Sequence, residues 1–463
     1  MGKYFGTDGF RGEANVQLTA AHGYAIGRFL GWYFLTKQNE KPKIVVGKDP
    51  RRSSYMLEYA VMAGLSASGC DAYLLHVTTT PSVSYITRVD QFSAGVMISA
   101  SHNPFYDNGI KLLSPNGEKM EEGVLDLCEA YLDGNLSALG VTTPDLPLAK
   151  GEDIGRIIDY VSGRNRYIGY LISTAACSFR DLRVGLDCAN GSAWMIARAV
   201  FEALGATVYA INAEPNGINI NQNAGSTHID GLVKLVKREK LDIGFAFDGD
   251  GDRCLAVSET GEVITGDHIL YLFAKHFKKE GSLPHHTVVA TIMSNMGLDI
   301  ALKKEGIATV KTPVGDKFVG ECMAKEGYAL GGEQSGHIIL SKYAKTGDGI
   351  LTAVKLADCM LQKEQPISEL YKGFFMYPQC LYSIRVKDKA AAMTDPDLLL
   401  AKEEAEQVLG EQGRLVLRPS GTEPVIRIMT EAQTLPLAQT AANLIRTALL
   451  PHSIVGTCRS VND

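Results

Sequence analysis

The stretch Asp242–Arg253, with the sequence DIGFAFDGDGDR, is an apolar run that ends in an acidic, glycine-rich loop. Asp242–Phe247 has the length and composition of a buried β-strand, and the Gly and Asp residues after it are typical of a loop. Short apolar runs of this kind recur, each closed by a polar loop and followed by a helical pattern. This alternation predicts α/β units, in which ligands collect at the carboxyl ends of the strands. The other runs are Lys43–Val46, Gly95–Ile98, Arg183–Leu186, Val288–Ile292 and Tyr328–Leu330.

Two stretches interrupt the alternation and predict domain boundaries. Residues Asn135–Gly155 contain prolines and glycines without a clear period, and Lys363–Gln379 is rich in turn residues. A strand–helix–strand–strand–helix order follows, which predicts a small α+β module. The length of the chain adds a third boundary, near residue 255. We therefore expect three consecutive α/β (mixed-sheet) domains, residues 1–155, 156–254 and 255–368, and a C-terminal α+β domain, residues 369–463.

The C-terminal module contains one well-signalled helix. Asp395 is a favourable N-cap residue, Pro396 suits the first helical position, and Gly410 is typical of the residue after a helix. These signals predict a helix between Pro396 and Gly410.

Composition excludes several classes of protein. The chain has 46 Lys and Arg against 52 Asp and Glu, so charge gives no reason to expect nucleic acid or an anionic membrane as a partner. A hydrophobic content of 45% excludes global disorder. No uncharged apolar run approaches the roughly 18 residues of a membrane span, and Met1–Glu13 lacks the apolar core of a secretory signal. The nine scattered cysteines, without a CxxC pair, indicate reduced thiols, so we expect a cytoplasmic protein without disulfides or zinc.

Three carboxylates alternate with glycines in the acidic loop. Asp248, Asp250 and Asp252 would share one face of an extended strand, and the glycines would let the loop curl around an ion. Hard divalent cations prefer such oxygen ligands, so the loop predicts a metal site, with a solvated acidic turn as the alternative. An EF-hand is excluded, because its sixth position requires glycine and here is Arg253.

The loop Ser99–Pro104, SASHNP, follows the apolar run Gly95–Ile98. It is either a plain turn before Asn-Pro or a nucleophilic serine presented at the end of a strand. A protease-type serine is disfavoured, because GxSxG is absent and His102 is not expected to reach back to its neighbour's hydroxyl. Lys111, after the turn YDNGI, would bring an amine back over the serine.

Three further loops carry groups that bind phosphate or sugar. Arg418–Pro424, RPSGTEP, offers a guanidinium, hydroxyls and flexible amides, which suits a phosphate dianion or forms a plain hairpin loop. Gly332–His337, GEQSGH, offers a carboxylate, a hydroxyl and an imidazole for sugar hydroxyls, or is only structural. Gly6–Gly12, GTDGFRG, places Arg11 in another glycine-rich turn.

Taken together, these loops resemble the α-D-phosphohexomutase superfamily, most closely its bacterial phosphoglucosamine mutases. The serine, metal, sugar and phosphate loops occur in the family's order across nearly the whole chain. GTDGFRG and Gln334 are similar to the glucosamine branch, because mannose and glucose mutases more often have Met at the latter position. Phe10 stands where that branch usually has Ile, which is a conservative departure.

The resemblance implies four domains around a central cleft and an isomerase that interconverts glucosamine 6-phosphate and glucosamine 1-phosphate. Ser101 would be phosphorylated and would pass the phosphoryl group to the sugar through a 1,6-bisphosphate intermediate. Asp248, Asp250 and Asp252 would bind one Mg²⁺ per subunit together with an oxygen on Ser101. Glucose or glucosamine 1,6-bisphosphate would act as activator, and the product would feed UDP-N-acetylglucosamine and cell-wall synthesis.

The resemblance also implies roles for the other loop residues. Arg11 and Arg253 would flank the moving phosphoryl group. Lys111, or else His337, would shuttle the hydroxyl proton, and a lysine base would need a lowered pKa. Residues expected to bind the sugar hydroxyls are Glu333 and Ser335, those expected to hold the non-reacting phosphate are Arg418, Ser420, Gly421 and Thr422, and Thr312–Asp316 is expected to line the same cleft.

Two alternatives remain open. The sugar could differ, as in a phosphomannomutase or phosphoglucomutase of the same superfamily. The chain could also be a non-catalytic protein that binds sugar phosphates on the same fold. In each case the expected partner is a small sugar phosphate, with no nucleic acid and no membrane, and the protein is expected to be a monomer or a homodimer.

Overall fold

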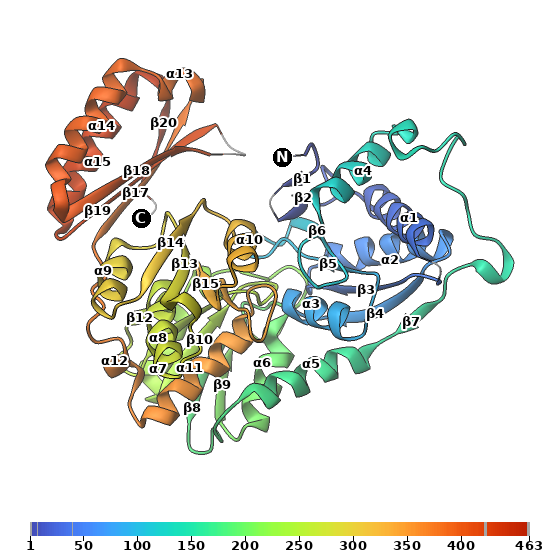
Figure 1. Cartoon of the computed structure of the whole chain (residues 1–463), viewed down its shortest axis with the longest axis horizontal. Coiled ribbons are helices and arrows are strands. Elements are labelled where there is room, and N and C mark those ends of the chain that lie inside the picture. The colour runs from blue at the N-terminus through green and yellow to red at the C-terminus, as the bar shows by residue number, and fades with distance from the viewer. Residues whose placement is uncertain (1, 7, 39, 421–423, 461–463) are drawn as a thin grey trace. The chain divides into compact units, whose positions relative to one another are not determined.

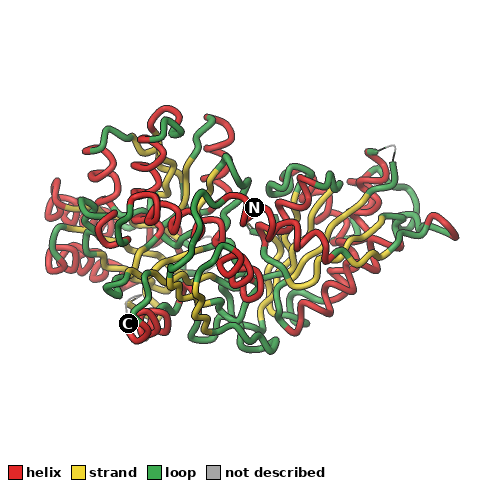
Figure 2. The backbone as a smooth tube through the Cα atoms, turned by 90° about the horizontal axis from the view of Figure 1, so that it is seen from below, coloured by secondary structure: helices red, strands yellow, loops and turns green. Residues whose placement is uncertain are grey.

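The computed structural model describes residues 2–6, 8–38, 40–420 and 424–460. The chain forms two compact units, of which the first comprises residues 1–289 with 312–371 and the second residues 290–311 with 372–463. Within both units, helices lie along strands that are gathered into sheets (Figures 1 and 2).

The first sheet has seven strands in the order β1-β2-β6-β5-β3-β4-β7. β3, β4, β5 and β7 are parallel, whereas β6 returns antiparallel to β5 and sets Lys111 opposite Met97. Apolar side chains of β3 and α2, such as Ile44, Val46 and Leu57, are fully buried in the core beneath this sheet. Its elements are β1 (Phe5–Gly6), β2 (Gly9–Glu13), α1 (Ala20–Lys37), β3 (Lys43–Lys48), α2 (Arg52–Ala67), β4 (Asp71–Val77), α3 (Thr80–Val89), β5 (Ala94–Ile98), β6 (Asp107–Leu113), α4 (Glu122–Leu132) and β7 (Ile157–Asp159).

The second sheet has five strands in the order β12-β11-β10-β8-β9. β8, β9 and β10 are parallel, and β11 turns back antiparallel to β10. The pair Phe247 and Cys254 closes the connection, so the six residues Asp248–Arg253 form a hairpin loop with fixed ends. The elements are α5 (Val161–Thr174), β8 (Arg183–Asp187), α6 (Ala193–Ala203), β9 (Thr207–Ile211), α7 (Asp230–Glu239), β10 (Ile243–Phe247), β11 (Cys254–Ser258) and β12 (Val263–Ile264).

A third α/β region follows, and its strands β15 and β16 are joined by a short loop. They pair antiparallel, with Gly332 opposite Ile338, so the residues between them project from the end of the pair. The helix α11 is almost entirely buried over its first twelve residues. In the first unit, the elements of this part of the chain are α8 (Gly266–Lys279), α10 (Asp316–Glu326), β15 (Leu330–Gly332), β16 (Ile338–Leu340), α11 (Gly349–Lys363) and α12 (Ile367–Leu370). Helix α9 (Met296–Lys304) belongs to the second unit, and the boundaries between the units fall within β13 (Thr287–Thr291) and β14 (Ala308–Thr312).

The start of α8 carries a histidine that is expected to make stability depend on pH. His268 is 9% exposed, and its Nδ1 accepts the backbone N–H of the N-cap residue Thr265 at 3.2 Å. Burial lowers the pKa of His268 to about 4, because the charged ring would lose both its solvation and this hydrogen bond.

The stability that the neutral ring contributes is therefore complete above pH 6.5, the unfolded pKa, and is lost as pH falls to about 4. His268→Gln keeps an acceptor for the N-cap N–H and should flatten this part of the profile. At pH 4, the contribution to the free energy of unfolding that the wild type loses is on the order of 2–3 kcal/mol. Melting temperatures of both proteins between pH 4 and 7.5 check this, and parallel profiles would contradict it.

The second unit contains a four-stranded antiparallel sheet in the order β18-β19-β17-β20. Helices α14 and α15 lie side by side against this sheet (Figure 1), and residues such as Leu398, Ile428 and Ile445 form the core between them. The elements are β17 (Gln379–Val386), α13 (Lys389–Met393), α14 (Pro396–Leu409), β18 (Gly413–Pro419), β19 (Val425–Ala432), α15 (Leu435–Leu449) and β20 (Ser453–Ser460).

The predicted fold class, mixed α/β sheets followed by a C-terminal α+β domain, is confirmed. The predicted helix in the C-terminal domain is confirmed as well. It begins at Pro396 after the N-cap Asp395, whose side chain accepts the backbone N–H of Asp397, and Gly410 follows its last residue. The four domain ranges stay a prediction.

Eight cysteines have side chains that the structure describes. None of these eight is in a disulfide, and six of them are buried. No helix in the described part of the chain has both the length and the apolar character needed to cross a membrane. The free cysteines are Cys70, Cys128, Cys177, Cys188, Cys254, Cys322, Cys359 and Cys380.

Candidate active site

The loop after β5 presents Ser101 in an unusual backbone conformation. Ser101 is fully buried, and its φ of +51° lies in the left-handed region, which is uncommon for residues other than glycine. Its Oγ donates a hydrogen bond to Asp248 Oδ2 at 2.6 Å. Ser99 Oγ donates to Asp49 Oδ2 at 2.7 Å and accepts the N–H of Ser101 at 3.0 Å. The Ser99 hydroxyl therefore supports the loop, whereas the Ser101 hydroxyl faces the acidic cluster.

The expectation that His102 cannot reach its neighbour is wrong. His102 Nδ1 lies 3.3 Å from Ser101 Oγ. Successive side chains point to opposite faces in an extended strand, and the left-handed conformation of Ser101 removes that constraint. Burial and the positive charges of Arg253 and Arg11 lower the pKa of His102 to about 4, so the ring is neutral at physiological pH.

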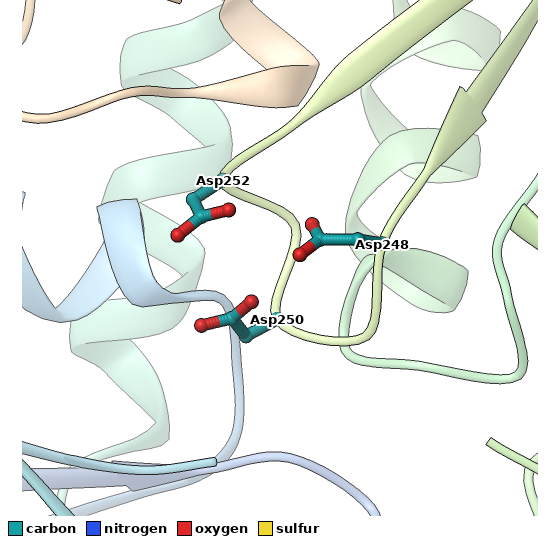
Figure 3. A group of neighbouring side chains, drawn as sticks. All are labelled: Asp248, Asp250 and Asp252. Atoms are coloured by element: carbon teal, nitrogen blue, oxygen red, sulfur yellow. The ribbon is translucent and has the colours of Figure 1, made fainter. Parts of the chain in front are cut away.

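The hairpin loop between β10 and β11 turns its three carboxylates toward one another (Figure 3). One oxygen from each of Asp248, Asp250 and Asp252 lies within 4.8 Å of the others, and all three residues are buried. The intervening Gly249 is required by a close approach, because a Cβ there would lie 2.4 Å from the carbonyl oxygen of Ser101. The glycine thus lets the acidic loop and the serine loop touch.

This donor set fits a hard divalent cation. Within the described residues, Asp250 Oδ1 and Asp252 Oδ1 are buried and have no hydrogen-bond partner, which is costly for carboxylate oxygens unless a cation completes their surroundings. Three carboxylates and a hydroxyl are oxygen ligands of the kind that Mg²⁺ and Ca²⁺ take. Asp248, Asp250 and Asp252 therefore have the chemistry to hold a metal ion.

The three carboxyl groups differ in the direction in which their surroundings shift the pKa. Burial raises the pKa of Asp248 well above its ordinary value, and the charges of Asp252 and Asp250 raise it further. Burial and Asp250 likewise raise the pKa of Asp252. Burial opposes ionisation of Asp250 too, but the Lys111 ammonium and hydrogen bonds from Lys111 and Thr80 hold its pKa below the ordinary range. Like charges crowded in this way are relieved by a bound cation.

Lys111 comes from β6, where the antiparallel return from β5 directs it to the acidic cluster. Its Nζ lies 2.8 Å from Asp250 Oδ2, 3.1 Å from Asp8 Oδ2 and 3.6 Å from Asp252 Oδ2. Burial acts to lower the pKa of Lys111, but these three carboxylates raise it well above the ordinary value. The ammonium form is therefore favoured, which is opposite to the shift that a lysine base needs.

Two arginines flank the cluster. The Arg253 N–H donates to Asp248 Oδ1 at 3.2 Å, and its guanidinium Nε lies 4.0 Å from Asp252 Oδ1. The guanidinium of Arg11 pairs with Asp8. The Nε atoms of both arginines are buried and have no hydrogen-bond partner in the described part of the chain. They are donors available to an anion such as a phosphoryl group.

The loop between β15 and β16 lies against the acidic loop. Arg253 and His337 form a backbone bridge, and the N–H of Cys254 donates to Gly336 O at 3.0 Å. His337 Nε2 accepts the N–H of Gly347 at 3.2 Å, which puts the proton of a neutral ring on Nδ1. Lys111, Asp252 and His337 line one cavity of about 270 Å³.

Two residues of this loop have the predicted sugar-binding chemistry. Glu333 Oε1 accepts the N–H of Gly315 at 3.1 Å, so the segment Thr312–Asp316 lies beside the loop. Ser335 Oγ is buried and has no hydrogen-bond partner among the residues described. A carboxylate and a hydroxyl are groups that hydrogen-bond sugar hydroxyls, so the side chains of this loop have the predicted chemistry.

The predicted phosphate loop belongs to the second unit. Arg418 is in β18, and its Nε is buried without a hydrogen-bond partner in the described chain. Burial and the charge of Arg427 lower the pKa of Arg418. The N–H of Ser420 donates to Val425 O at 2.9 Å. The predicted residues Gly421 and Thr422 lie outside the described residues.

Several contributors were missed by the sequence argument. Thr80 Oγ1 donates to Asp250 Oδ2 at 2.6 Å. Lys119 Nζ lies 3.0 Å from Asp8 Oδ1 and 2.8 Å from Asp316 Oδ1. Asp8 and Asp316 stand within stretches that the sequence singled out, but no local motif marks Thr80 or Lys119.

Four family models match the chain and together cover most of it. Their descriptions are phosphoglucomutase/phosphomannomutase alpha/beta/alpha domain I, II and III, and phosphoglucomutase/phosphomannomutase C-terminal domain. The matched residues are 2–136 for domain I, 165–261 for domain II, 265–377 for domain III and 381–448 for the C-terminal domain.

Curated relatives match over nearly their full length. A phosphoglucosamine mutase from Lachnospira eligens is 59% identical over 433 residues, covering 93% of this chain and 95% of the relative. A phosphoglucosamine mutase from Anoxybacillus flavithermus is 47% identical over 435 residues, covering 94% of this chain and 95% of the relative.

Solved structures share the fold at low identity. A phosphoglucomutase/phosphomannomutase family protein from Burkholderia thailandensis has a TM-score of 0.80 at 22% identity, covering 97% of this chain and 98% of its own. The N-acetylphosphoglucosamine mutase of Aspergillus fumigatus, solved in complex with GlcNAc-6P and magnesium, has a TM-score of 0.68 at 17% identity and covers 97% and 96% of the two chains.

Proposed function

Because the chain belongs to the phosphoglucomutase/phosphomannomutase family, we propose that this isomerase interconverts glucosamine 6-phosphate and glucosamine 1-phosphate through a phosphoserine at Ser101. The names of relatives at 59% and 47% identity support glucosamine as the sugar. The observation that carries the proposal is the 2.6 Å hydrogen bond from Ser101 Oγ to Asp248 Oδ2. It joins a buried hydroxyl at the end of β5 to the carboxylate cluster at the end of β10.

Asp248, Asp250 and Asp252 would hold one Mg²⁺ together with an oxygen on Ser101, and the ion would offset negative charge on the transferring group. Phosphorylated Ser101 gives its phosphoryl group to a sugar hydroxyl, so the bond from phosphorus to Oγ breaks as the bond to the sugar oxygen forms. The available N–H groups of Arg11 and Arg253 stabilise the charge on the equatorial oxygens. The proton of the attacking hydroxyl must leave, and Ser101 Oγ must be neutralised when it is released.

Lys111 and His337 remain the candidates for this proton transfer, because both line the cavity beside Asp252. Lys111 would act as a base only after its three carboxylates are neutralised, and a divalent cation bound to the cluster would weaken their hold on its proton. In the neutral tautomer described above, His337 offers Nδ1–H as a hydrogen-bond donor, and it would take up a proton only at Nε2, which already accepts the N–H of Gly347. Glu333 and Ser335 would hold ring hydroxyls.

A mutase must bind its substrate in two opposite orientations, with the distant phosphate held by one common site. We assign that site to Arg418, Ser420, Gly421 and Thr422. The unused donor on Arg418 supports this assignment. A hexose 1,6-bisphosphate would phosphorylate Ser101 and activate the enzyme.

Arg418→Ala is expected to lower kcat/KM in both reaction directions by about 30- to 100-fold, because a charge-assisted hydrogen bond to phosphate is lost. Free 1,6-bisphosphate should rise relative to product, since the intermediate is held less firmly while it reorients. Arg385→Ala, which removes an exposed arginine on strand β17 of the same sheet, is the control for loss of a positive charge. Unchanged kcat/KM for Arg418→Ala in both directions would place the distal phosphate elsewhere.

The proposed function is tested by assaying glucosamine, mannose and glucose 1-phosphates side by side with Mg²⁺ and a hexose 1,6-bisphosphate. The glucosamine substrate should have the highest kcat/KM, and intact mass should show one added phosphate on the activated protein. Preference for another hexose would reassign the substrate. If none of the three substrates is turned over, the result would favour the alternative of a non-catalytic protein that binds sugar phosphates.

A further inference from the structure

A fully buried arginine lies directly behind the serine loop. Arg51 precedes helix α2, is 0% exposed and is not part of the predicted site. Its guanidinium donates to Asp49 Oδ2 at 2.7 Å, and its other contacts are backbone carbonyls of the serine loop and the following strand. These acceptors are Ser101 O at 2.8 Å, Asn103 O at 2.9 Å, Asp107 O at 3.1 Å and Pro104 O.

The backbone of Ser101 is held on both sides. Its carbonyl oxygen accepts hydrogen bonds from Arg51 and from Asn221 Nδ2, each at 2.8 Å. Its N–H donates to Ser99 Oγ, and Ser99 in turn donates to Asp49. Asp49 also accepts the N–H and Nε of Arg51. Arg51 and Asp49 therefore fix both peptide groups of the residue that carries the hydroxyl.

This arrangement opposes a conformational preference of serine. A φ of +51° brings the Cβ of a non-glycine residue too close to the following carbonyl, so Ser101 favours other conformations when it is unrestrained. A return to an ordinary φ would reorient the Ser101 carbonyl and move Oγ away from Asp248. Buried carbonyl oxygens also need donors, and the planar guanidinium supplies several at fixed angles, which an ammonium group cannot do.

We infer that Arg51 is a positioning residue for the phosphoryl-transfer reaction, holding Ser101 in the left-handed conformation that aims its Oγ at the metal-binding carboxylates. The inference rests on the proposed function for its catalytic consequence. It acts through the backbone of the loop, because its guanidinium contacts carbonyl oxygens and Asp49 and not the Ser101 hydroxyl.

The catalytic test is Arg51→Lys, which keeps the charge beside Asp49 but loses the fork of donors. We expect kcat to fall by about 100-fold, the scale of a small misplacement of reacting atoms, while KM stays within about threefold. Phosphorylation of Ser101 by glucose 1,6-bisphosphate, followed by intact mass, should slow in parallel. Arg52→Ala removes the adjacent exposed arginine and is the control, with kcat expected to match the wild type. An Arg51→Lys enzyme with wild-type kcat would overturn the inference.

A second measurement needs no catalysis. Glycine adopts positive φ without strain, so Ser101→Gly should melt about 1 °C above Ser101→Ala when the loop is held as described. In an Arg51→Lys background this difference should vanish, because the loop is free to relax. A difference of the same size in both backgrounds would overturn the inference. If the wild type turns over no hexose phosphate, the proposed function fails, and the comparison of melting temperatures still decides what Arg51 does.

Discussion

Replacing Ser101 with alanine is expected to reduce the mutase rate by about four orders of magnitude or more, because the substitution removes the hydroxyl that is proposed to carry the phosphoryl group. Substrate should still bind with nearly unchanged affinity, since the arginines and the sugar loop remain. Steady-state rates and a binding titration with glucosamine 6-phosphate measure the two effects separately.

Ser99→Ala is the matched comparison for this prediction. It removes a hydroxyl from the same loop, one that bonds Asp49 and the Ser101 N–H, so it should slow the enzyme without abolishing phosphorylation. After incubation with a hexose 1,6-bisphosphate, the mass of Ser99→Ala should rise by one phosphate and that of Ser101→Ala should not. More than about a tenth of wild-type kcat in Ser101→Ala would assign the nucleophile elsewhere.

Asp250→Asn is expected to lower kcat by about three orders of magnitude and to raise the Mg²⁺ concentration needed for half-maximal activity. The substitution removes one of three anionic ligands and also the closest charge partner of Lys111. A Mg²⁺ titration separates the two effects, because only the loss of a ligand shifts its midpoint.

Two controls accompany this prediction. Asp126→Asn changes an exposed carboxylate on α4 and should leave both kcat and the Mg²⁺ midpoint unchanged. Wild-type enzyme treated with EDTA should lose activity and regain it with added Mg²⁺. Full activity in EDTA would show that the carboxylate cluster is not a functional metal site.

Local sequence was sufficient for the parts of the molecule that local chemistry determines. The run before Asp248 predicted a strand and its loop, and the three alternating carboxylates do converge. Asp395, Pro396 and Gly410 predicted the ends of α14, because capping depends on a few adjacent residues. A resemblance over four loops, rather than any one loop, supplied the expected chemistry.

What sequence could not provide depends on contacts between distant segments. Thr80 reaches Asp250 across 170 positions of the chain. Lys111 has a raised pKa because three carboxylates from two loops surround it, and no local sequence pattern predicts how many carboxylates lie near it. The contact of His102 with Ser101 depends on a left-handed backbone, which serine seldom adopts and which a propensity argument therefore misses.

The close approach of Gly249 to Ser101 has an evolutionary consequence. A Cβ at position 249 would meet the Ser101 carbonyl at 2.4 Å, so any side chain there would act as a wedge between the serine loop and the acidic loop. One codon change would then separate the nucleophile from its carboxylates while leaving every reactive side chain encoded. A descendant could retain the full set of catalytic residues and yet be a pseudoenzyme. Where two loops of an active site touch, the glycine at the contact therefore indicates whether a related protein is active as clearly as the reactive side chains do.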